Sequence, residues 1–260
     1  MTGAAMASAG ERLPVNAAPY TMILYEDPSG RRVRSRIVPE LAAVRFEQSA
    51  PIRRFPAYPG RRSHQGRYWL SRSGAHVQFE SRFEMTALMV LDFEGQAVAV
   101  SSNPFWLLWP RGSDPQRHAP DFFIRRTDGS VLVMDVKPAS RLTDNDRIQH
   151  ARTRAVCGEL SWEYREFTNI ASPLERNLRL LCGYHHRRFG PSAAIRDAVL
   201  GELRSSDVEA MRLDTLINTA CARTGLHDGV ILCGVYHMLW CGELQVDLNY
   251  PLTWDTTVRA

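Results

Sequence analysis

The order of apolar and polar positions changes near residue 170 of this 260-residue chain. Before that point, short runs of alternating polarity predict strands, such as 20–26 and 32–38 around the turn Asp27-Pro-Ser-Gly30. After it, apolar residues recur mainly at helical spacing. The pattern therefore predicts an α/β core followed by a helical region.

Between residues 73 and 170 the expected elements are those of a mixed sheet with flanking helices. Apolar positions at helical spacing predict a helix over 79–91. A second helix over 144–157 begins after Thr143, a suitable N-cap. The expected strands are 97–101, 105–109, 121–126, 131–137 and 162–167. This order of elements indicates an α/β core with a mixed central sheet.

The C-terminal region, residues 171–260, is expected to be a helical, winged-helix-like domain. The segment 242–252 alternates in polarity like a short hairpin or wing that would close the helices. Residues 1–19 are interpreted as a disordered leader and 20–72 as a basic, β-rich N-terminal segment. The expected C-terminal helices are 173–185, 191–203, 208–222 and 229–239.

Charge is unevenly distributed along the chain. Residues 1–72 carry 12 Arg against 5 acidic residues, whereas the remainder has 20 basic and 23 acidic side chains. A basic N-terminal third suits a polyanion such as nucleic acid, and solvated arginine surface is the alternative. No apolar run approaches the roughly 20 residues of a membrane span, and the first 18 residues lack the order of a signal peptide. A cytoplasmic protein with no membrane partner is expected.

The five cysteines are odd in number and show no C-x-x-C spacing. Cys233, His237 and Cys241 are spaced by four and would share one helix face, which would allow a zinc site. Structural zinc normally has four ligands. Small buried thiols on an apolar helix are the simpler interpretation.

The sharpest compositional feature is that Lys137 is the only lysine among 32 basic residues. Every other basic residue of the chain is arginine. The single lysine therefore indicates a position where arginine cannot take its place. Lys137 closes the motif Asp135-Val136-Lys137, and the two-residue period of a strand puts Asp135 and Lys137 on one face. The preceding strand opens with Pro120-Asp121.

The loop between these strands decides which residues meet. A three-residue loop over 127–129, with Gly129 in the left-handed conformation, sets Asp121 opposite Asp135. A two-residue loop would set Asp121 opposite Val136, and Asp135 would face away. Metal chemistry needs the first register, which we therefore predict, with the two carboxylates within about 6 Å.

These residue types are the ones that metal-dependent phosphodiester hydrolysis requires. Asp121 and Asp135 offer the oxygen ligands that Mg²⁺ prefers, and Lys137 offers a cation for the nucleophile or oxyanion. On the expected helix Glu84 lies on an apolar stripe, where a carboxylate needs a compensating metal or cation. Glu80, one turn earlier, is a candidate supporting residue or minor ligand. An exposed hairpin with an Asp–Lys pair, and helix-end acids that stabilise the dipole (a role that fits Glu80 better), are the alternatives.

Three segments together resemble a known family. The segment Glu80-Ser-Arg-Phe-Glu-Met-Thr-Ala-Leu-Met-Val-Leu-Asp-Phe, then Pro120-Asp121 and Asp135-Val-Lys-Pro138, resembles the TnsA-like endonuclease subunits of heteromeric transposases, in the PD-(D/E)xK nuclease superfamily. The likeness runs from about residue 78 to 167 and more weakly over 238–248. It implies a restriction-endonuclease-like core.

The resemblance also implies an activity and its partners. Such a subunit is a Mg²⁺-dependent DNA endonuclease, with Mn²⁺ able to substitute, that hydrolyses phosphodiesters at the 5′ ends of a transposon. Its partners are double-stranded DNA at the transposon ends, a DDE-type transposase and an AAA+ ATPase regulator. The catalytic set is Glu84, Asp121, Asp135 and Lys137, and the metal ligands are Glu84, Asp121, Asp135 and the backbone carbonyl of Val136. Some members carry Gln where this chain has Asp135.

Two other functions remain open at this stage. A restriction-type or junction-resolving nuclease would use the same four residues. A non-catalytic docking module of a transposition complex would keep only the fold. The helical tail favours the transposase subunit, and the intact set of acids and lysine favours catalysis. Because the tail is not basic, it is at least as suited to a partner protein as to DNA.

Overall fold

The computed structural model describes residues 13–14, 16–53, 64–205 and 210–260. Residues 1–12 and 15 of the expected leader, and residues 54–63 of the basic N-terminal segment, lie outside the described residues. Ala17 and Ala18, near the end of the expected leader, are buried in the core cluster, so the leader does not extend to residue 19. The chain forms two compact units, one of residues 1–88 with 96–169 and the other of residues 89–95 with 170–260. The basic N-terminal segment belongs to the first unit, together with the strands of the expected core.

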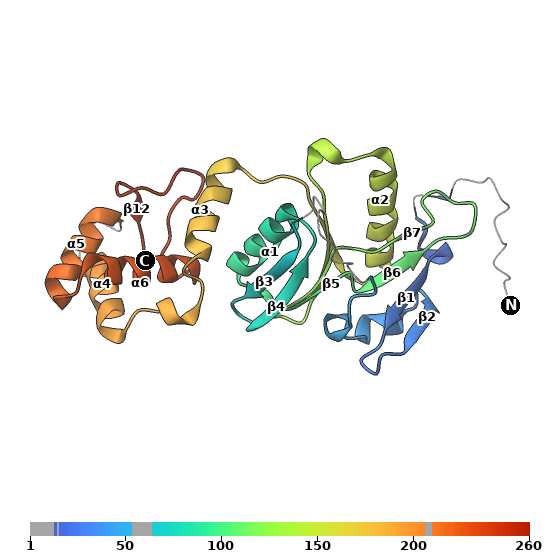
Figure 1. Ribbon diagram of the computed structural model, residues 1–260, viewed down its shortest axis with the longest axis horizontal. Helices are drawn as coiled ribbons and strands as arrows, with labels where there is room; N and C mark the ends of the chain where they lie inside the picture. Colours follow the sequence, from blue (N-terminus) through green and yellow to red (C-terminus); the bar gives the residue numbers. More distant parts are fainter. Residues whose placement is uncertain (1–12, 15, 54–63, 206–209) are drawn as a thin grey trace. The chain divides into compact units, whose positions relative to one another are not determined.

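A four-stranded mixed sheet in the first unit carries the Asp-x-Lys strand (Figure 1). Its order is β10-β9-β8-β5, with β10 parallel to β9 and β8 antiparallel to both of its neighbours. The prediction of an α/β core with a mixed central sheet is confirmed. The strands are β5 (Ala97–Ser102), β8 (Phe122–Arg126), β9 (Val131–Val136) and β10 (Glu163–Phe167).

An antiparallel sheet in the order β2-β1-β6-β7 accompanies the mixed sheet. The two predicted N-terminal strands and the turn between them are confirmed. Phe46, which is fully buried, joins the two sheets, because its ring packs edge-on against Tyr25, Phe105 and Phe123. The strands are β1 (Met22–Glu26), β2 (Arg32–Arg36), β6 (Phe105–Leu108) and β7 (Arg117–His118).

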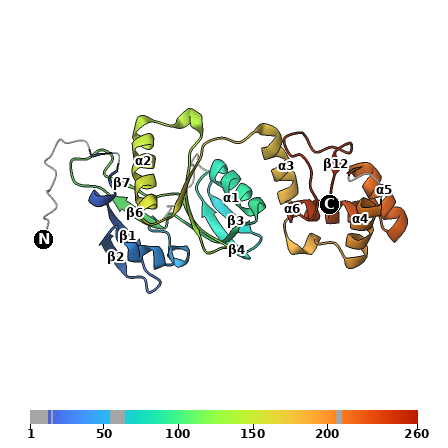
Figure 2. The same ribbon diagram turned by 180° about the vertical axis from the view of Figure 1, so that it is seen from behind.

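The mixed sheet is covered on both faces. Helix α2 (Asp144–Glu159) lies on one side and the first turns of α1 (Arg82–Glu94) on the other (Figures 1 and 2). Val131 and Val133 pack with Val156 of α2 in one core cluster, whereas Met134 is buried without belonging to it, as strand alternation requires. Thr143 caps α2 in a reciprocal capping box with Asp146, so the predicted N-cap is confirmed.

Helix α1 begins later than predicted. Phe79 ends β4 (Ala75–Phe79), which pairs with β3 (Gly66–Leu70) in a hairpin that the sequence pattern did not reveal. The apolar residue at 79 fits both a helical and a strand period, which is why the predicted helix began too early. Glu84 therefore lies in the first turn of α1, and Glu80 precedes the helix. The expected apolar stripe is confirmed, because Glu84, Ala87, Leu88 and Leu91 are all buried. The helix-end role that was thought to fit Glu80 better belongs instead to Glu84.

The second unit is mainly helical, as predicted, but the expected hairpin at 242–252 is absent from its described strands. Asn177, which is buried, donates to the carbonyls of Leu248 and Tyr250 and accepts from the N–H of Leu252. The alternating segment is thus a loop wrapped around one amide side chain. The elements are α3 (Ser172–Cys182), α4 (Ala193–Ser205), β11 (Met211–Arg212), α5 (Leu213–Thr224), α6 (Asp228–Trp240) and β12 (Thr257–Val258).

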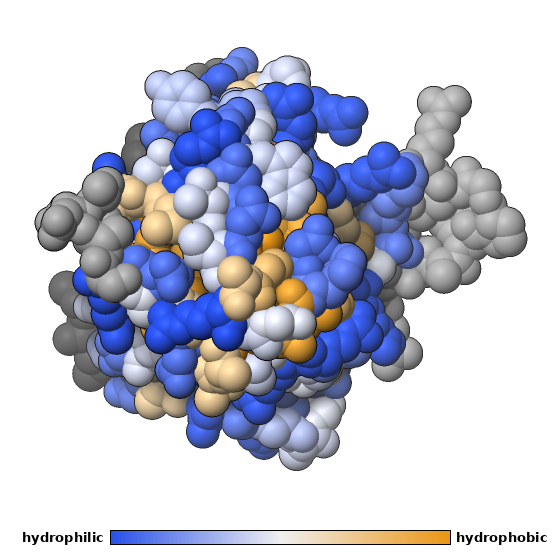
Figure 3. Space-filling model, turned by 90° about the vertical axis from the view of Figure 1, so that its left-hand side faces the viewer, coloured by the Kyte–Doolittle hydropathy of each residue, from blue (hydrophilic) through white to orange (hydrophobic). Residues whose placement is uncertain are grey.

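The face of the molecule shown in Figure 3 is mostly hydrophilic. Figure 3 shows apolar side chains in small areas between charged and polar ones. In the part of the chain that the structure describes, no helix is long and apolar enough to cross a membrane.

The His237 Nε2 atom contacts Cys241 Sγ at 3.4 Å, while its Nδ1 contacts the Tyr184 carbonyl oxygen at 2.8 Å.

Candidate active site

The β8–β9 hairpin has the register that the proposed chemistry requires. Phe122 pairs with Met134, and the Arg126 N–H donates to the Ser130 carbonyl oxygen at 3.0 Å across a three-residue loop. Gly129 ends that loop with φ of 83°, in the left-handed region. The predicted loop is confirmed, and one further step along the ladder sets Asp121 opposite Asp135.

Asp121 lies where the two strands part. Its backbone carbonyl accepts from Asn103 on the β5 side, and its Oδ2 accepts from the Val136 N–H at 2.7 Å. A carboxylate therefore takes the place of a backbone carbonyl at the end of the β8–β9 ladder. Burial, followed by the negative charges of Asp135 and Glu84, raises the pKa of Asp121 well above its usual range. Asp135 and Glu84 are thus each close enough to Asp121 to repel its negative charge.

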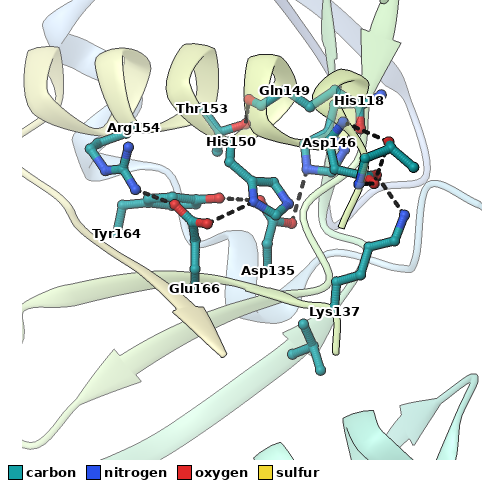
Figure 4. A network of polar contacts seen from close by, with 12 residues as sticks. His118, Asp135, Lys137, Asp146, Gln149, His150, Thr153, Arg154, Tyr164 and Glu166 are labelled. Atoms are coloured by element: carbon teal, nitrogen blue, oxygen red, sulfur yellow. Dashed lines mark hydrogen bonds and ion pairs between the residues drawn. The ribbon is translucent and has the colours of Figure 1, made fainter. Parts of the chain in front are cut away.

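Asp135 is the most deeply held of the four predicted residues, with 1% of its surface exposed. Its Oδ1 contacts His118 Nε2 at 2.9 Å, and its Oδ2 accepts from the Tyr164 hydroxyl at 2.6 Å (Figure 4). Burial acts to raise the pKa of Asp135, but the charge and hydrogen bond of His118, with His150 and Tyr164, lower it below the usual value. The two aspartates therefore shift in opposite directions, a pattern found at functional sites.

Lys137 is held by a residue that the sequence did not single out. Its Nζ donates to Asp146 Oδ1 at 2.6 Å, at the start of α2 (Figure 4). Burial raises the pKa of Asp146, but the hydrogen bonds from Lys137 and Thr143 outweigh it and lower that pKa to about 2. Lys137 and Asp135 thus both contact groups on the α2 side, as the two-residue period predicts.

Glu84 is buried and serves first as a helix cap. Its Oε2 accepts from the Glu80 N–H at 2.7 Å and its Oε1 from the Ser81 hydroxyl at 2.9 Å, while the Ser81 hydroxyl accepts from the Glu84 N–H. Burial nevertheless raises the pKa of Glu84. Glu80 forms an ion pair with Arg53 of the N-terminal segment at 2.5 Å. Glu84 therefore acts on Asp121 through its charge, and Glu80 is engaged elsewhere.

Several residues of the site were missed by the sequence analysis. Strand alternation and the parallel pairing of β10 with β9 put Tyr164 and Glu166 on the Asp135 face, a signal that could have been used. His150 contacts Glu166 at 2.9 Å, and its ring centre lies 6.1 Å from that of His118. No local pattern marks His118, because its contact with Asp135 spans 17 residues.

The donor chemistry fits a hard divalent cation. Asp135 and Glu84 each repel the Asp121 carboxylate, and a cation would relieve that repulsion. Their oxygens are engaged by N–H, O–H and imidazole groups, and among the described residues no three His, Cys, Asp or Glu side chains converge on one metal position. Negative charge therefore gathers around Asp121, but the described residues do not form a complete set of converging metal ligands.

Tyr164→Phe tests whether the buried hydroxyl stabilises Asp135. Removing the 2.6 Å hydrogen bond leaves a buried carboxylate oxygen with one donor fewer. We expect a loss of about 1–3 kcal/mol in the free energy of unfolding. Urea denaturation at neutral pH measures it, with Tyr25→Phe as the control, because Tyr25 belongs to the core cluster against which Tyr164 packs. If Tyr164→Phe is as stable as the wild type, the Tyr164 hydroxyl contributes nothing to the stability of the fold.

No protein-family model matches the chain, and a search of curated proteins gives no match. The function must therefore be inferred from the residues and their geometry.

Proposed function

We propose that this chain is a metal-dependent DNA endonuclease with a restriction-endonuclease-like core of the PD-(D/E)xK type. The observation that carries the proposal is the β8–β9 hairpin, whose register sets Asp121 opposite Asp135. The raised pKa of Asp121, caused by burial and by the charges of Asp135 and Glu84, supports a site suited to a cation. The mixed sheet with one helix on each face agrees with such a core.

Each residue of the site has a separate role in the proposed reaction. Asp121 and Asp135 would hold Mg²⁺ or Mn²⁺, with Glu84 and the Val136 carbonyl as further ligands. The ion would supply charge neutralisation at the scissile phosphate and activation of water. His118 and Tyr164 would orient Asp135 through their contacts with its two carboxylate oxygens. Asp146 would position the Lys137 ammonium for a phosphate oxygen or the nucleophile.

We further propose that the chain acts as the TnsA-like subunit of a heteromeric transposase. It would hydrolyse phosphodiesters at transposon 5′ ends beside a DDE-type transposase, under an AAA+ ATPase regulator. The resemblance around Glu84, Asp121 and Asp135-Val-Lys137 supports this role, and the helical second unit, proposed as winged-helix-like, offers a surface for a partner protein or DNA.

Cleavage is expected to depend on the partner. An unregulated nuclease without a sequence-reading motif would damage its host, so the purified chain with Mg²⁺ and arbitrary duplex DNA should cut little. Adding the transposase and DNA that carries transposon ends should produce 5′-end cuts. Gel analysis of end-labelled DNA measures both. Efficient, partner-free cutting at a defined sequence would instead favour a restriction-type enzyme. If no cleavage is seen with or without metal, even when the transposase is present, a docking module is favoured.

A further inference from the structure

A cavity of about 620 Å³ lies beside the candidate active site in the first unit. Three of its lining residues, 81–83, directly precede Glu84 at the start of α1. Three others come from the segment 138–141, which follows Lys137 at the end of β9. The cavity is therefore bounded by the two chain segments that carry the predicted acid and the predicted lysine.

The lining of this cavity is cationic. Its charged residues are Arg82 and Arg141, joined by His64 and the hydroxyl side chains of Ser81 and Ser140, and no acidic residue lines it. Arg82 donates to the His64 Nε2 atom at 3.1 Å, because a guanidinium cannot accept. Within the described ranges, neither arginine forms an ion pair with a carboxylate. Two exposed guanidinium groups thus remain available to an anion.

The sequence before the cavity segment 81–83 is also positively charged. Residues 49–79, which precede the segment 81–83 in the sequence, contain six Arg and no Asp or Glu. The cavity also lies at the N-terminal end of the 13-residue helix α1, whose partial positive charge favours anions. Phe83 and Pro138 supply an apolar part of the lining, which suits the sugar of a nucleotide. Arginine forks and hydroxyl groups are the usual partners of phosphate oxygens in protein–DNA contacts.

We infer that this cavity binds the sugar–phosphate backbone of DNA next to the scissile phosphate, with Arg82 and Arg141 each contacting a phosphate. This inference rests on the proposed nuclease function and names the surface that presents the substrate to Asp121 and Asp135. A volume of about 620 Å³ is within the range of ligand sites and larger than a single phosphate requires. A stretch of backbone is therefore the better occupant than an isolated anion.

Binding of a labelled duplex by the full chain, measured by fluorescence anisotropy in EDTA, tests the inference without cleavage. Each of Arg82→Ala and Arg141→Ala should weaken binding by roughly 5- to 10-fold. Each should also lower the slope of log K against log salt by about 1, and the double variant by about 2. Arg187→Ala, an exposed arginine of the second unit, removes the same charge and is the matched control. Thermal melting verifies that all variants fold.

The outcomes test DNA binding by the cavity and nuclease activity independently. If Arg82→Ala and Arg141→Ala bind as the Arg187 control does, the cavity is not a DNA site, whether or not Asp121→Asn abolishes cutting. If they lose affinity and salt slope while no metal-dependent cutting is found, the DNA site stands and the nuclease proposal falls. Displacement of DNA by inorganic phosphate at matched ionic strength would identify a free-phosphate site and overturn the inference.

Discussion

Asp121→Asn is expected to reduce metal-dependent cleavage by about 1,000-fold or more and, without metal, to make the protein more stable. In the wild type the Val136 N–H donates to Asp121 Oδ2 at 2.7 Å. Asparagine keeps an oxygen that can accept this hydrogen bond, so the end of the hairpin should be preserved. It lacks the negative charge that a divalent ion requires. A loss of this size is at the upper end of what removal of one preorganised electrostatic group costs.

The gain in stability follows from the direction of the pKa shift. Burial and the charges of Asp135 and Glu84 raise the pKa of Asp121 in the folded state. The fold therefore favours the protonated carboxyl. This contribution to stability is complete below the unfolded-state pKa, near 4, and is lost as the pH rises through the raised folded-state pKa. At neutral pH the wild type carries that cost, and the asparagine variant does not.

Melting curves at pH 4.5 and pH 7.5 measure this difference. The asparagine variant should melt higher than the wild type at pH 7.5 in EDTA, by about 2–4 °C for each kcal/mol of relieved repulsion. The difference should shrink at the lower pH. Mg²⁺ should raise the melting temperature of the wild type alone. Asp197→Asn, at an exposed position of α4, removes the same charge as a control and should change neither cleavage nor melting appreciably. A less stable Asp121→Asn that still cuts would refute the site.

The parts of the structure that local chemistry decides could be predicted from the sequence. Gly129 fixed the loop length and thereby the register of Asp121, and Thr143 with Asp146 fixed the start of α2. Each depends on residues within a few positions of one another. The same reasoning failed at Phe79, where an apolar residue at a strand end matched a helical period.

Contacts between distant segments could not be predicted in this way. The Tyr164 hydroxyl reaches Asp135 across 29 residues, and the Asn177 side chain reaches Leu252 across 75. Such contacts depend on how strands and helices pack, which a single sequence does not encode in any local pattern. The predicted acids were therefore found, whereas the groups that hold them in place were not.

The contact between Lys137 and Asp146 gives the solitary lysine a second possible role. Asp146 also accepts from the Thr143 N–H and hydroxyl, so the lysine ammonium joins the cap of α2. A lysine needed only for that cap would be replaceable by arginine, because a guanidinium pairs with a carboxylate at least as well. A lysine needed for chemistry would not be replaceable. The two roles make opposite predictions for one substitution.

Lys137→Arg is expected to lower cleavage by at least about 100-fold and to leave the melting temperature close to that of the wild type. A guanidinium is larger and planar, and its fork would engage Asp146 or a carboxylate of the site, which misplaces the charge or displaces the ion. The loss matches that of one transition-state donor. The assay is cleavage with the transposase present, beside thermal melting of the same preparations.

Asp146→Asn distinguishes the lysine's role in the cap from its role in catalysis. Asparagine retains an acceptor for the Thr143 groups but breaks the ion pair with Lys137. If the lysine acts only through the cap, Asp146→Asn should destabilise the fold and lower cleavage, whereas Lys137→Arg should cut normally. If the ammonium acts on the phosphate or the nucleophile, Lys137→Arg should be the more damaging of the two. Near-wild-type cutting by Lys137→Arg would make the only lysine of the chain an ordinary cation.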